Sequence, residues 1–127
     1  MIEEDYVSFE TAKLLKEKGF DKCCYLSYHY NESFGKWFKT SEYIDSRFKK
    51  YYYPCPTLQM AMKWLREVHN IDINVYAESI SHKKRYTISI WKNIQDDDAI
   101  NDVILGVSTI YEEACEAAIK YCLENLI

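Results

Sequence analysis

The sequence has few of the residues that build loops: its 127 residues include only three Gly and two Pro. This composition excludes collagen-like and low-complexity proteins. No apolar run reaches the roughly 18 residues that a membrane-spanning helix needs, and the acidic residues 1–5 are unlike the basic start of a secretory signal. The length is that of one domain. We therefore expect a single folded domain over residues 1–127, cytoplasmic and without a membrane partner.

Signatures of catalysis and metal binding are also missing. The three His are far apart in sequence, and the five cysteines contain no C-x-x-C pair, which argues against zinc and against a disulfide framework. No G-x-S-x-G turn marks a nucleophile, and the isolated glycines form no phosphate-cradling loop. Residues 96–98 are three aspartates, but a calcium loop spaces its ligands differently, so a solvated turn is the favoured interpretation. We expect no enzyme, metal or cofactor.

Cysteine chemistry leaves one alternative open. Cys55 lies between two prolines, just upstream of an expected helix start, where the pKa of a thiol can be lowered. The simpler interpretation is that Cys55 is structural. Cys115 and Cys122, seven residues apart in a helical pattern, are expected to be buried on one face as small apolar groups.

Aromatic residues are unusually frequent, with three Trp, five Phe and twelve Tyr. A core of this size cannot enclose 20 rings, so some of them are expected to face a partner. The net charge is -4; residues 1–56 carry nine basic and nine acidic side chains, and residues 57–127 carry seven and eleven. The acidic excess therefore lies in the second half, and general binding to polyanions is not expected.

The first half predicts a helix and a strand before its most distinctive stretch. Ser8 is placed to cap a helix that ends at Gly19, and residues 23–30 lack helical spacing and predict a strand. Residues 34–53, the basic-aromatic segment, then interleave eight rings with five basic and two acidic residues, a balance of +3.

Residues 57–92 predict a helix and two strands. A helix capped by Thr57 is expected to end at His69-Asn70, with one buried stripe made of Leu58, Ala61, Met62, Leu65 and Val68. Residues 71–80 and 86–91 alternate apolar and polar side chains, which indicates two half-buried antiparallel strands joined by a turn at SHKKR. The alternation places Tyr76 and Trp91 on the face opposite the helices, where they are either covered or form a binding platform.

The C-terminal residues predict a short strand and a long helix. The strand is expected over residues 103–105, after an acidic loop, and ends at Gly106. Thr109 and Glu112 have the spacing of a capping box. The helix that follows presents an apolar stripe of Tyr111, Ala114, Cys115, Ala118, Cys122 and Leu126.

Together these elements predict an α+β fold. Residues 1–56 supply a helix, a strand and the basic-aromatic segment, and residues 57–127 supply an α-β-β-β-α unit. We expect one antiparallel sheet with helices packed on one face.

The α-β-β-β-α part resembles the double-stranded RNA-binding domain over about 70 residues. SHKKRYTISI resembles the His-containing loop that leads into the second strand of that family, and GVSTIYEEACEAAIKYCLENL resembles its Gly-Ser turn and Ala-rich last helix. The family holds phosphate with lysines at the start of this helix, where the present sequence has Glu112, Glu113 and Glu116. These carboxylates would repel a duplex, so long duplex nucleic acid is not expected as a partner.

A second resemblance covers more of the chain. VSFETAKLLKEKGFD, YYYPCPTLQMAMKWLREVHNI and YEEACEAAIKYCLENLI are similar to recurring blocks of small uncharacterised proteins from phages and prophages of gut Bacteroides-type bacteria. No activity comes with that resemblance. It implies a protein that acts in the cytoplasm of a bacterial host cell, where small phage proteins bind host factors or sequester nucleotide signals of host defence.

Two cationic clusters, each beside aromatic residues, are the candidate ligand site. Rings stack on bases while Lys and Arg meet phosphates. The candidates are Arg47, Lys49, Lys50, Tyr51 and Tyr52 in the first cluster, and Lys83, Lys84, Arg85, Tyr86 and Trp91 in the second. The expected function is the sequestration of a small anionic ligand such as a nucleotide signal, by one pocket if the two clusters fold together.

Other interpretations stay open. Alternating Tyr and Lys are also typical of a strand that packs one face and solvates the other. The exposed aromatic residues would equally suit a module that binds and inhibits a host protein. A degenerate RNA-binding domain and a homo-oligomer are the remaining alternatives.

Overall fold

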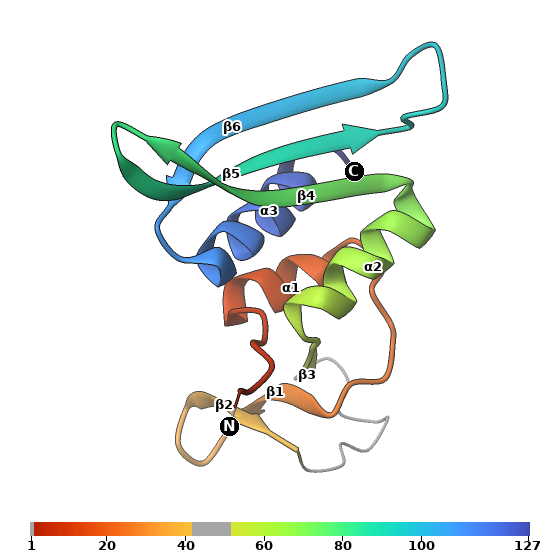
Figure 1. The fold of residues 1–127 in the computed structure, drawn as a ribbon. Coiled ribbons are helices and arrows are strands. Elements are labelled where there is room, and N and C mark those ends of the chain that lie inside the picture. Colours follow the sequence, from red (N-terminus) through yellow and green to blue (C-terminus); the bar gives the residue numbers. More distant parts are fainter. Residues whose placement is uncertain (1, 42–51) are drawn as a thin grey trace. The chain divides into compact units, whose positions relative to one another are not determined.

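The computed structural model describes residues 2–41 and 52–127 (Figure 1). The chain divides into two compact units, Met1–Thr57 (unit 1) and Leu58–Ile127 (unit 2). The order of elements is α1 (Phe9–Glu17), β1 (Leu26–Asn31), β2 (Lys36–Thr40), β3 (Tyr52–Cys55), α2 (Leu58–His69), β4 (Ile71–Ile80), β5 (Lys83–Lys92), β6 (Ile100–Ser108) and α3 (Tyr111–Asn125). The predicted α+β class and the α-β-β-β-α order of residues 57–127 are confirmed.

The helix of unit 1 begins and ends where its sequence signals indicate. The Oγ atom of Ser8 accepts a hydrogen bond from the backbone N–H of Thr11 at 3.3 Å, so Ser8 is the N-cap. Gly19 has a φ of +100°, a left-handed conformation that glycine adopts without steric cost after a helix. The face of α1 that carries Thr11, Ala12 and Leu15 is buried.

The strands of unit 1 form a three-stranded antiparallel sheet in the order β2-β1-β3. Residues 23–25, which the sequence assigned to the first strand, precede β1. The segment before α1 is joined to the end of β3 by a hydrogen bond from the Val7 N–H to the Pro56 carbonyl at 3.0 Å. Both of these residues are buried. The chain therefore enters α1 from a fixed position beside the sheet.

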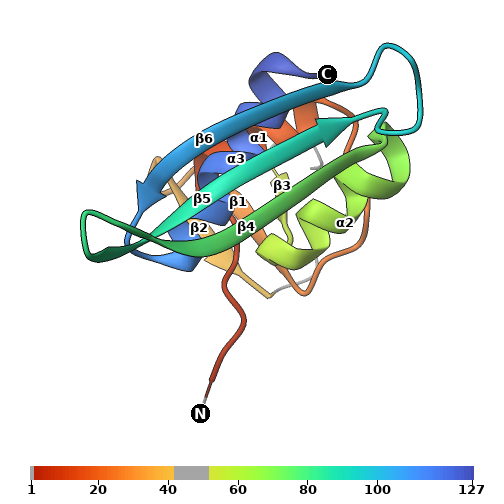
Figure 2. The same cartoon turned by 45° about the horizontal axis from the view of Figure 1, so that its top comes forward.

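The strands of unit 2 form a second antiparallel sheet, in the order β4-β5-β6. The described strands thus make two sheets where the sequence indicated one. Helices α2 and α3 cover one face of the β4-β5-β6 sheet (Figure 2). The alternation is as predicted, because Ile73 pairs with Ile90 and Val75 pairs with Ile88 on the covered face. Ile88 and Ile90 are fully buried there.

Helix α2 follows the predicted stripe except at its end. Its buried residues are Leu58, Ala61, Met62, Trp64 and Leu65. Val68 was expected in this stripe, but its side chain is 56% exposed. The stripe instead includes Trp64, whose large ring covers the last turn and packs edge-on against His69. Asn70, with a φ of +53°, ends the helix. None of the helices in the described residues is long and apolar enough to cross a membrane.

Helix α3 buries four of the six residues of the predicted stripe, whereas Tyr111 is half-buried and Leu126 lies just beyond the helix, and the predicted cap is not formed. Its buried residues are Ala114, Cys115, Ala118, Ile119, Cys122 and Leu123. The helix begins at Tyr111 with Ile110 at the N-cap position, so the capping box of Thr109 and Glu112 is wrong. Ser108 acts in its place: its Oγ atom accepts from the Ile110 N–H at 3.1 Å and donates to a carboxylate oxygen of Glu113 at 2.8 Å.

Strand β6 is longer than the sequence indicated. It extends over Ile100–Ser108, so part of the expected acidic loop is strand, and Gly106 lies inside the strand instead of ending it. Pairing with β5 is regular from Ile100 to Ile104 and shifts before Ser108. The extra residues between Ile104 and Ser108 form a β-bulge, in which Gly106 has a φ of +56°.

We predict that Ala118→Arg unfolds unit 2. Ala118 is fully buried in α3, and an arginine there would bring an unpaired charge and a long side chain into a dry interface. The expected loss is more than about 4 kcal/mol of unfolding free energy. Glu124→Arg, at an exposed position of the same helix, is the control and should change stability by no more than about 0.5 kcal/mol. Equal melting curves for both variants would contradict the assigned helix face.

Candidate functional site

A cluster of aromatic rings in mutual contact lies on the α1 side of the unit 1 sheet. The ring of Phe9 lies 5.4 Å from that of Tyr28, 5.1 Å from that of Trp37 and 5.6 Å from that of Tyr53. Trp37 and Tyr53 are themselves stacked at 4.8 Å. One side chain on each strand contacts the first residue of α1, so this half-buried inner ring cluster packs the helix against the sheet. It accounts for part of the high aromatic content without any partner.

A second row of rings lies on the opposite face of the same sheet. Successive side chains of a strand point to opposite faces, so the neighbours of the inner ring cluster point away from α1. The register pairs His29 with Phe38 on β2 and with Tyr52 on β3. Phe38, His29 and Tyr52 therefore form one row across three strands, which we call the outer ring row. Phe38 is 46% exposed.

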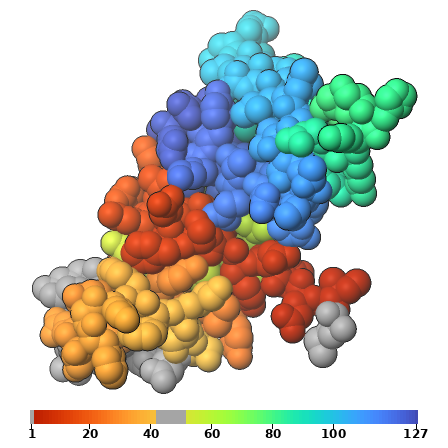
Figure 3. Space-filling model, turned by 90° about the vertical axis from the view of Figure 1, so that its left-hand side faces the viewer, coloured from red at the N-terminus to blue at the C-terminus, as the bar shows by residue number. Residues whose placement is uncertain are grey.

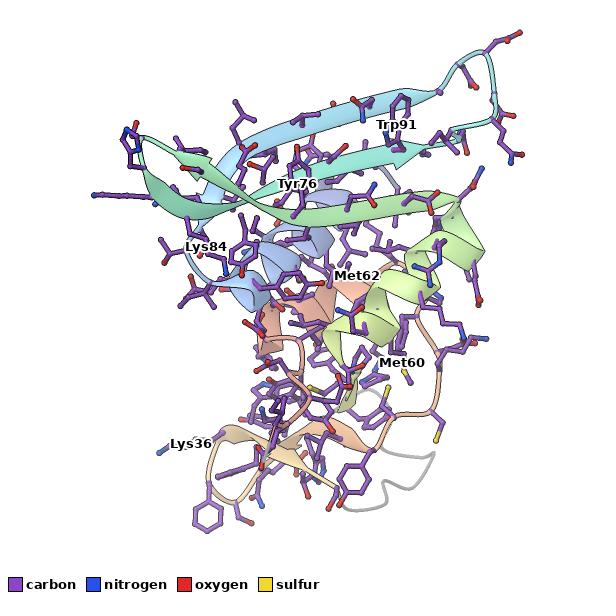
Figure 4. All side chains as sticks on the ribbon, viewed as in Figure 1. Lys36, Met60, Met62, Tyr76, Lys84 and Trp91 are labelled. Carbon is purple, nitrogen blue, oxygen red and sulfur yellow. The ribbon has the colours of Figure 1, made fainter. Side chains whose placement is uncertain are left out.

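Cationic side chains lie close to the outer ring row. Lys36 begins β2 on the same face as Phe38 and extends away from the hairpin (Figure 4). Lys16 of α1 donates from its Nζ atom to the Tyr52 carbonyl at 2.5 Å, but its Nζ lies nearer to the ring centroid of Tyr53, at 5.1 Å, than to that of Tyr52, at 5.8 Å, so it belongs to the α1 side of the sheet. At the hairpin tip, the ring of Phe34 is 71% exposed and packs edge-on against Phe38 at 6.2 Å. The exposed ring of Phe38 and the exposed Lys36 thus lie on one face of the sheet.

The sequence identified this surface only in part. Tyr52 was a candidate, and Phe34, Lys36 and Phe38 belong to the basic-aromatic segment, but His29 was considered only as a metal ligand. The alternation within Tyr28-His29-Tyr30 was the available signal, because two tyrosines that pack inward place the histidine between them on the other face. The candidates Arg47, Lys49, Lys50 and Tyr51 lie outside the described residues.

The second candidate cluster belongs to unit 2 and is divided between the two faces of its sheet. Lys83, Arg85 and Trp91 alternate along β5 with Lys84 and Tyr86. Lys84 and Tyr86 share the face of the buried Ile88, which the helices cover, and the other three residues point to the open face. Figure 4 shows Lys84 on the helix side of the sheet and Trp91 on the other side.

Lys84 and Tyr86 make contacts typical of a structural role. The Nζ atom of Lys84 lies 5.4 Å from the centroid of the Tyr86 ring, and that ring packs edge-on against Tyr111 of α3 at 5.6 Å. The Oη atom of Tyr111 accepts a hydrogen bond from the Gln59 side chain of α2 at 3.5 Å. These residues connect the hairpin to both helices of unit 2.

On the open face, Trp91 is too far from the cations of β5 to share a small ligand with them. Arg85 and Trp91 lie six residues apart on one strand, which corresponds to about 20 Å. Tyr76 of β4 pairs with Thr87 between them, on the face away from the helices (Figure 4). The structure therefore places Trp91 beside Asp72 and Asn101 instead of beside a cation.

Arg85 and Thr87 are engaged with the bulge of β6. The Nε atom of Arg85 donates to the Gly106 carbonyl at 2.8 Å, and the Gly106 N–H donates to the Thr87 Oγ1 atom at 3.0 Å. The Thr87 hydroxyl in turn donates to a carboxylate oxygen of Glu78 on β4. A connected set of polar contacts thus crosses all three strands, and we call it the bulge network.

Three of the five cysteines, Cys55, Cys115 and Cys122, are buried thiols. All five are free of disulfides. Burial raises the pKa of Cys122 to about 12, and burial together with the neighbouring Cys55 and Cys23 raises that of Cys24 to about 11. Cys55 is fully buried, and its Sγ atom donates to the Val7 carbonyl at 3.4 Å. Raised pKa values and enclosure suppress the thiolate that a nucleophile needs.

The Nε2 atom of His69 is buried and has no hydrogen-bond partner. Among the described residues it is the only buried side-chain nitrogen or oxygen of this kind. The imidazole packs edge-on against Trp64 at 4.7 Å. Burial, with a smaller effect of the Lys92 charge, lowers the pKa of His69 below its usual 6.5. The neutral form is therefore favoured in the folded state.

Within the described residues no group of three or more His, Cys, Asp or Glu side chains is arranged to hold a metal ion. Asp96–Asp98 lie in an exposed turn closed by a hydrogen bond from the Asp96 N–H to the Asn93 carbonyl at 2.9 Å. Comparison of the chain with known protein families, with curated proteins and with solved structures found no match.

We predict that Gly106→Ala destabilises unit 2 by about 1–3 kcal/mol. A non-glycine residue is strained at this positive φ, and its Cβ atom would lie 2.9 Å from Ile80 Cδ1 and 3.2 Å from Arg85 Nε. Gly35→Ala is the matched control: it has a similar φ of +61°, but its Cβ atom would meet only the Tyr30 Oη atom, at 3.8 Å. Chemical denaturation should show the larger loss for Gly106→Ala.

We also predict that the stability of unit 2 falls below about pH 6.5 because of His69. Its folded pKa is lower than its unfolded pKa, so protons bind the unfolded chain more tightly, and stability is lost as the pH falls through 6.5 towards the folded value. His69→Gln should remove this part of the pH dependence. Identical slopes of unfolding free energy against pH in both proteins would contradict the assignment.

Proposed function

We propose that the chain is a non-enzymatic binding protein whose unit 1 takes a small anionic ligand with a planar aromatic part, such as a nucleotide. The observation that carries the proposal is the outer ring row, Phe38, His29 and Tyr52, on the sheet face opposite α1. A strand side chain stands roughly perpendicular to its sheet, so the row presents rings at the spacing of adjacent strands, about 5 Å.

Stacking supplies the affinity for the planar part of the ligand. Base–aromatic stacking contributes about 1–3 kcal/mol per base and tolerates different bases, because each of them has a π-face. Phe38 and Phe34 are the accessible rings of this surface. Phe38 belongs to β2 and Phe34 to the turn before it, so the β1–β2 hairpin holds both rings in place.

Charge supplies the preference for an anion. Lys36 is exposed at the start of β2, and the basic-aromatic segment from which this strand comes has a balance of +3. In unit 2 the cations of β5 are divided between the two faces of the sheet, and one of them, Arg85, is bound within the bulge network. The finer hypothesis, a nucleotide signal of host defence, rests on the resemblance to phage proteins.

The proposal is tested by calorimetric titration of the full chain with ADP, adenosine and inorganic phosphate as separate probes. We expect ADP to bind more tightly than either of its parts, because rings and cations act together. Phe38→Ala should weaken ADP binding roughly ten-fold, the loss of one stacking contact. Lys36→Glu should weaken it as well, with a smaller effect at high salt.

Lys83→Glu is the matched control, because Lys83 is an exposed cation at the start of β5 in unit 2. It should leave ADP binding unchanged. Binding of adenosine as tight as that of ADP would contradict the role of the cations. ADP affinity that is undetectable, or that is unchanged by both unit 1 substitutions, would contradict the site.

A further inference from the structure

Strand β6 exposes an unusual amount of apolar surface. Val103 is 50% exposed and Leu105 69%, and large apolar side chains are also exposed at Ile100, Ile104 and Ile110. In Figure 3 the light-blue atoms of β6 form a strip at the surface, between the dark-blue atoms of α3 and the green β4–β5 hairpin. Contiguous exposed apolar side chains on a folded protein mark an interaction surface.

The backbone of β6 is also incompletely paired. It is the last strand in the order β4-β5-β6, and among the described residues no strand pairs with its outer edge. Its regular part, Ile100–Ile104, is straight and paired with β5. An outer edge of this kind presents N–H and C=O groups to which an extended peptide can add as a further strand.

Acidic residues flank this edge at both ends. Between Asn93 and Ile119 the sequence contains seven acidic residues and no basic one. Asp96–Asp98 lie before the strand, and Glu112 and Glu113 are exposed in the first turn of α3 after it. Asp102, the only charged residue within β6, accepts a hydrogen bond from the Tyr121 hydroxyl at 2.8 Å on the helix side. The edge is therefore apolar in the middle and negative at its ends.

A second copy of the chain does not fit this charge pattern. In an antiparallel pair of β6 strands centred on Ile104, residues equally far from the centre face each other. Both ends of the edge are acidic, so this pairing would bring acidic groups of the two copies together at each end. Parallel pairing in register would place Asp102 opposite Asp102. Like charges that face each other are destabilising.

We propose that β6 is the docking edge for an extended segment of a basic partner protein, with apolar side chains in its middle and Lys or Arg at both ends. The segment would add to the sheet beside Ile100–Ile104, cover Val103 and Leu105, and bring its cations to Asp96–Asp98 and to Glu112. The inference concerns unit 2 and is independent of the ligand proposed for unit 1.

The test uses a synthetic peptide of alternating Val and Thr with two lysines at each end, labelled for fluorescence anisotropy with the full chain. Its counterpart has the same middle and glutamates at the ends. We expect the lysine peptide to bind and the glutamate peptide not to bind, with affinity that falls as salt is added. Hydrogen exchange should slow at the amides of Ile100–Ile104 when the lysine peptide is present.

Matched variants distinguish binding at this edge from non-specific hydrophobic binding. The double substitution Val103→Ser and Leu105→Ser should weaken binding of the lysine peptide roughly ten-fold, a loss typical of interface anchors. Ile94→Ser removes an equally exposed apolar side chain from the turn before β6 and should have no effect.

Three outcomes would overturn the inference. The first is no binding of the lysine peptide, and the second is equal binding of both peptides. The third is a dimer in analytical ultracentrifugation that the double substitution dissociates, since this would assign the edge to a second copy. None of these results affects the ADP titration, so the proposals for the two units succeed or fail separately.

Discussion

The packing of α3 on the β4-β5-β6 sheet is the constraint on which the rest of unit 2 depends. Small side chains, Ala114 and Ala118, line the buried stripe of the helix and permit a close approach to the sheet. The sheet contributes Ile88 and Ile90, both fully buried. Because side chains of a strand alternate between its two faces, the residues next to Ile88 and Ile90 in sequence must point to the face away from the helix.

This constraint explains why adjacent cations in the sequence do not make a site. Lys83, Lys84 and Arg85 are consecutive, but a strand cannot direct consecutive side chains to one ligand. In the structure Lys84 is used against the Tyr86 ring and Arg85 against the Gly106 carbonyl. The outer ring row arises in the opposite way, from residues that are far apart in sequence and that strand pairing brings side by side. Composition indicated aromatic and cationic residues, but only the register shows which of them meet.

The sequence predicted the type and order of the helices and strands better than the residues at which they begin and end. Helices α1 and α2 and the alternation in β4 and β5 follow from hydrophobic periods and from Ser8, Gly19 and Asn70, which are local signals. The errors at β6 and α3 have a tertiary origin. Gly106 is typical of a strand end in isolation, but contacts from residues 19 and 21 positions earlier hold it within the strand. Thr109 has the right spacing for a cap, yet Ser108 is the residue whose side chain meets the first turn.

The bulge in β6 limits the addition of further strands to the β4-β5-β6 sheet. An exposed apolar edge is a template for open-ended association into fibres, and native proteins restrict it with short edges, bulges and inward-pointing charges. Strand β6 combines these features: its regular pairing stops at Ile104, the backbone turns at Gly106, and Asp102 points to the helix side. A strand that adds to this edge meets only the short regular section Ile100–Ile104, which limits how far backbone pairing can extend along it.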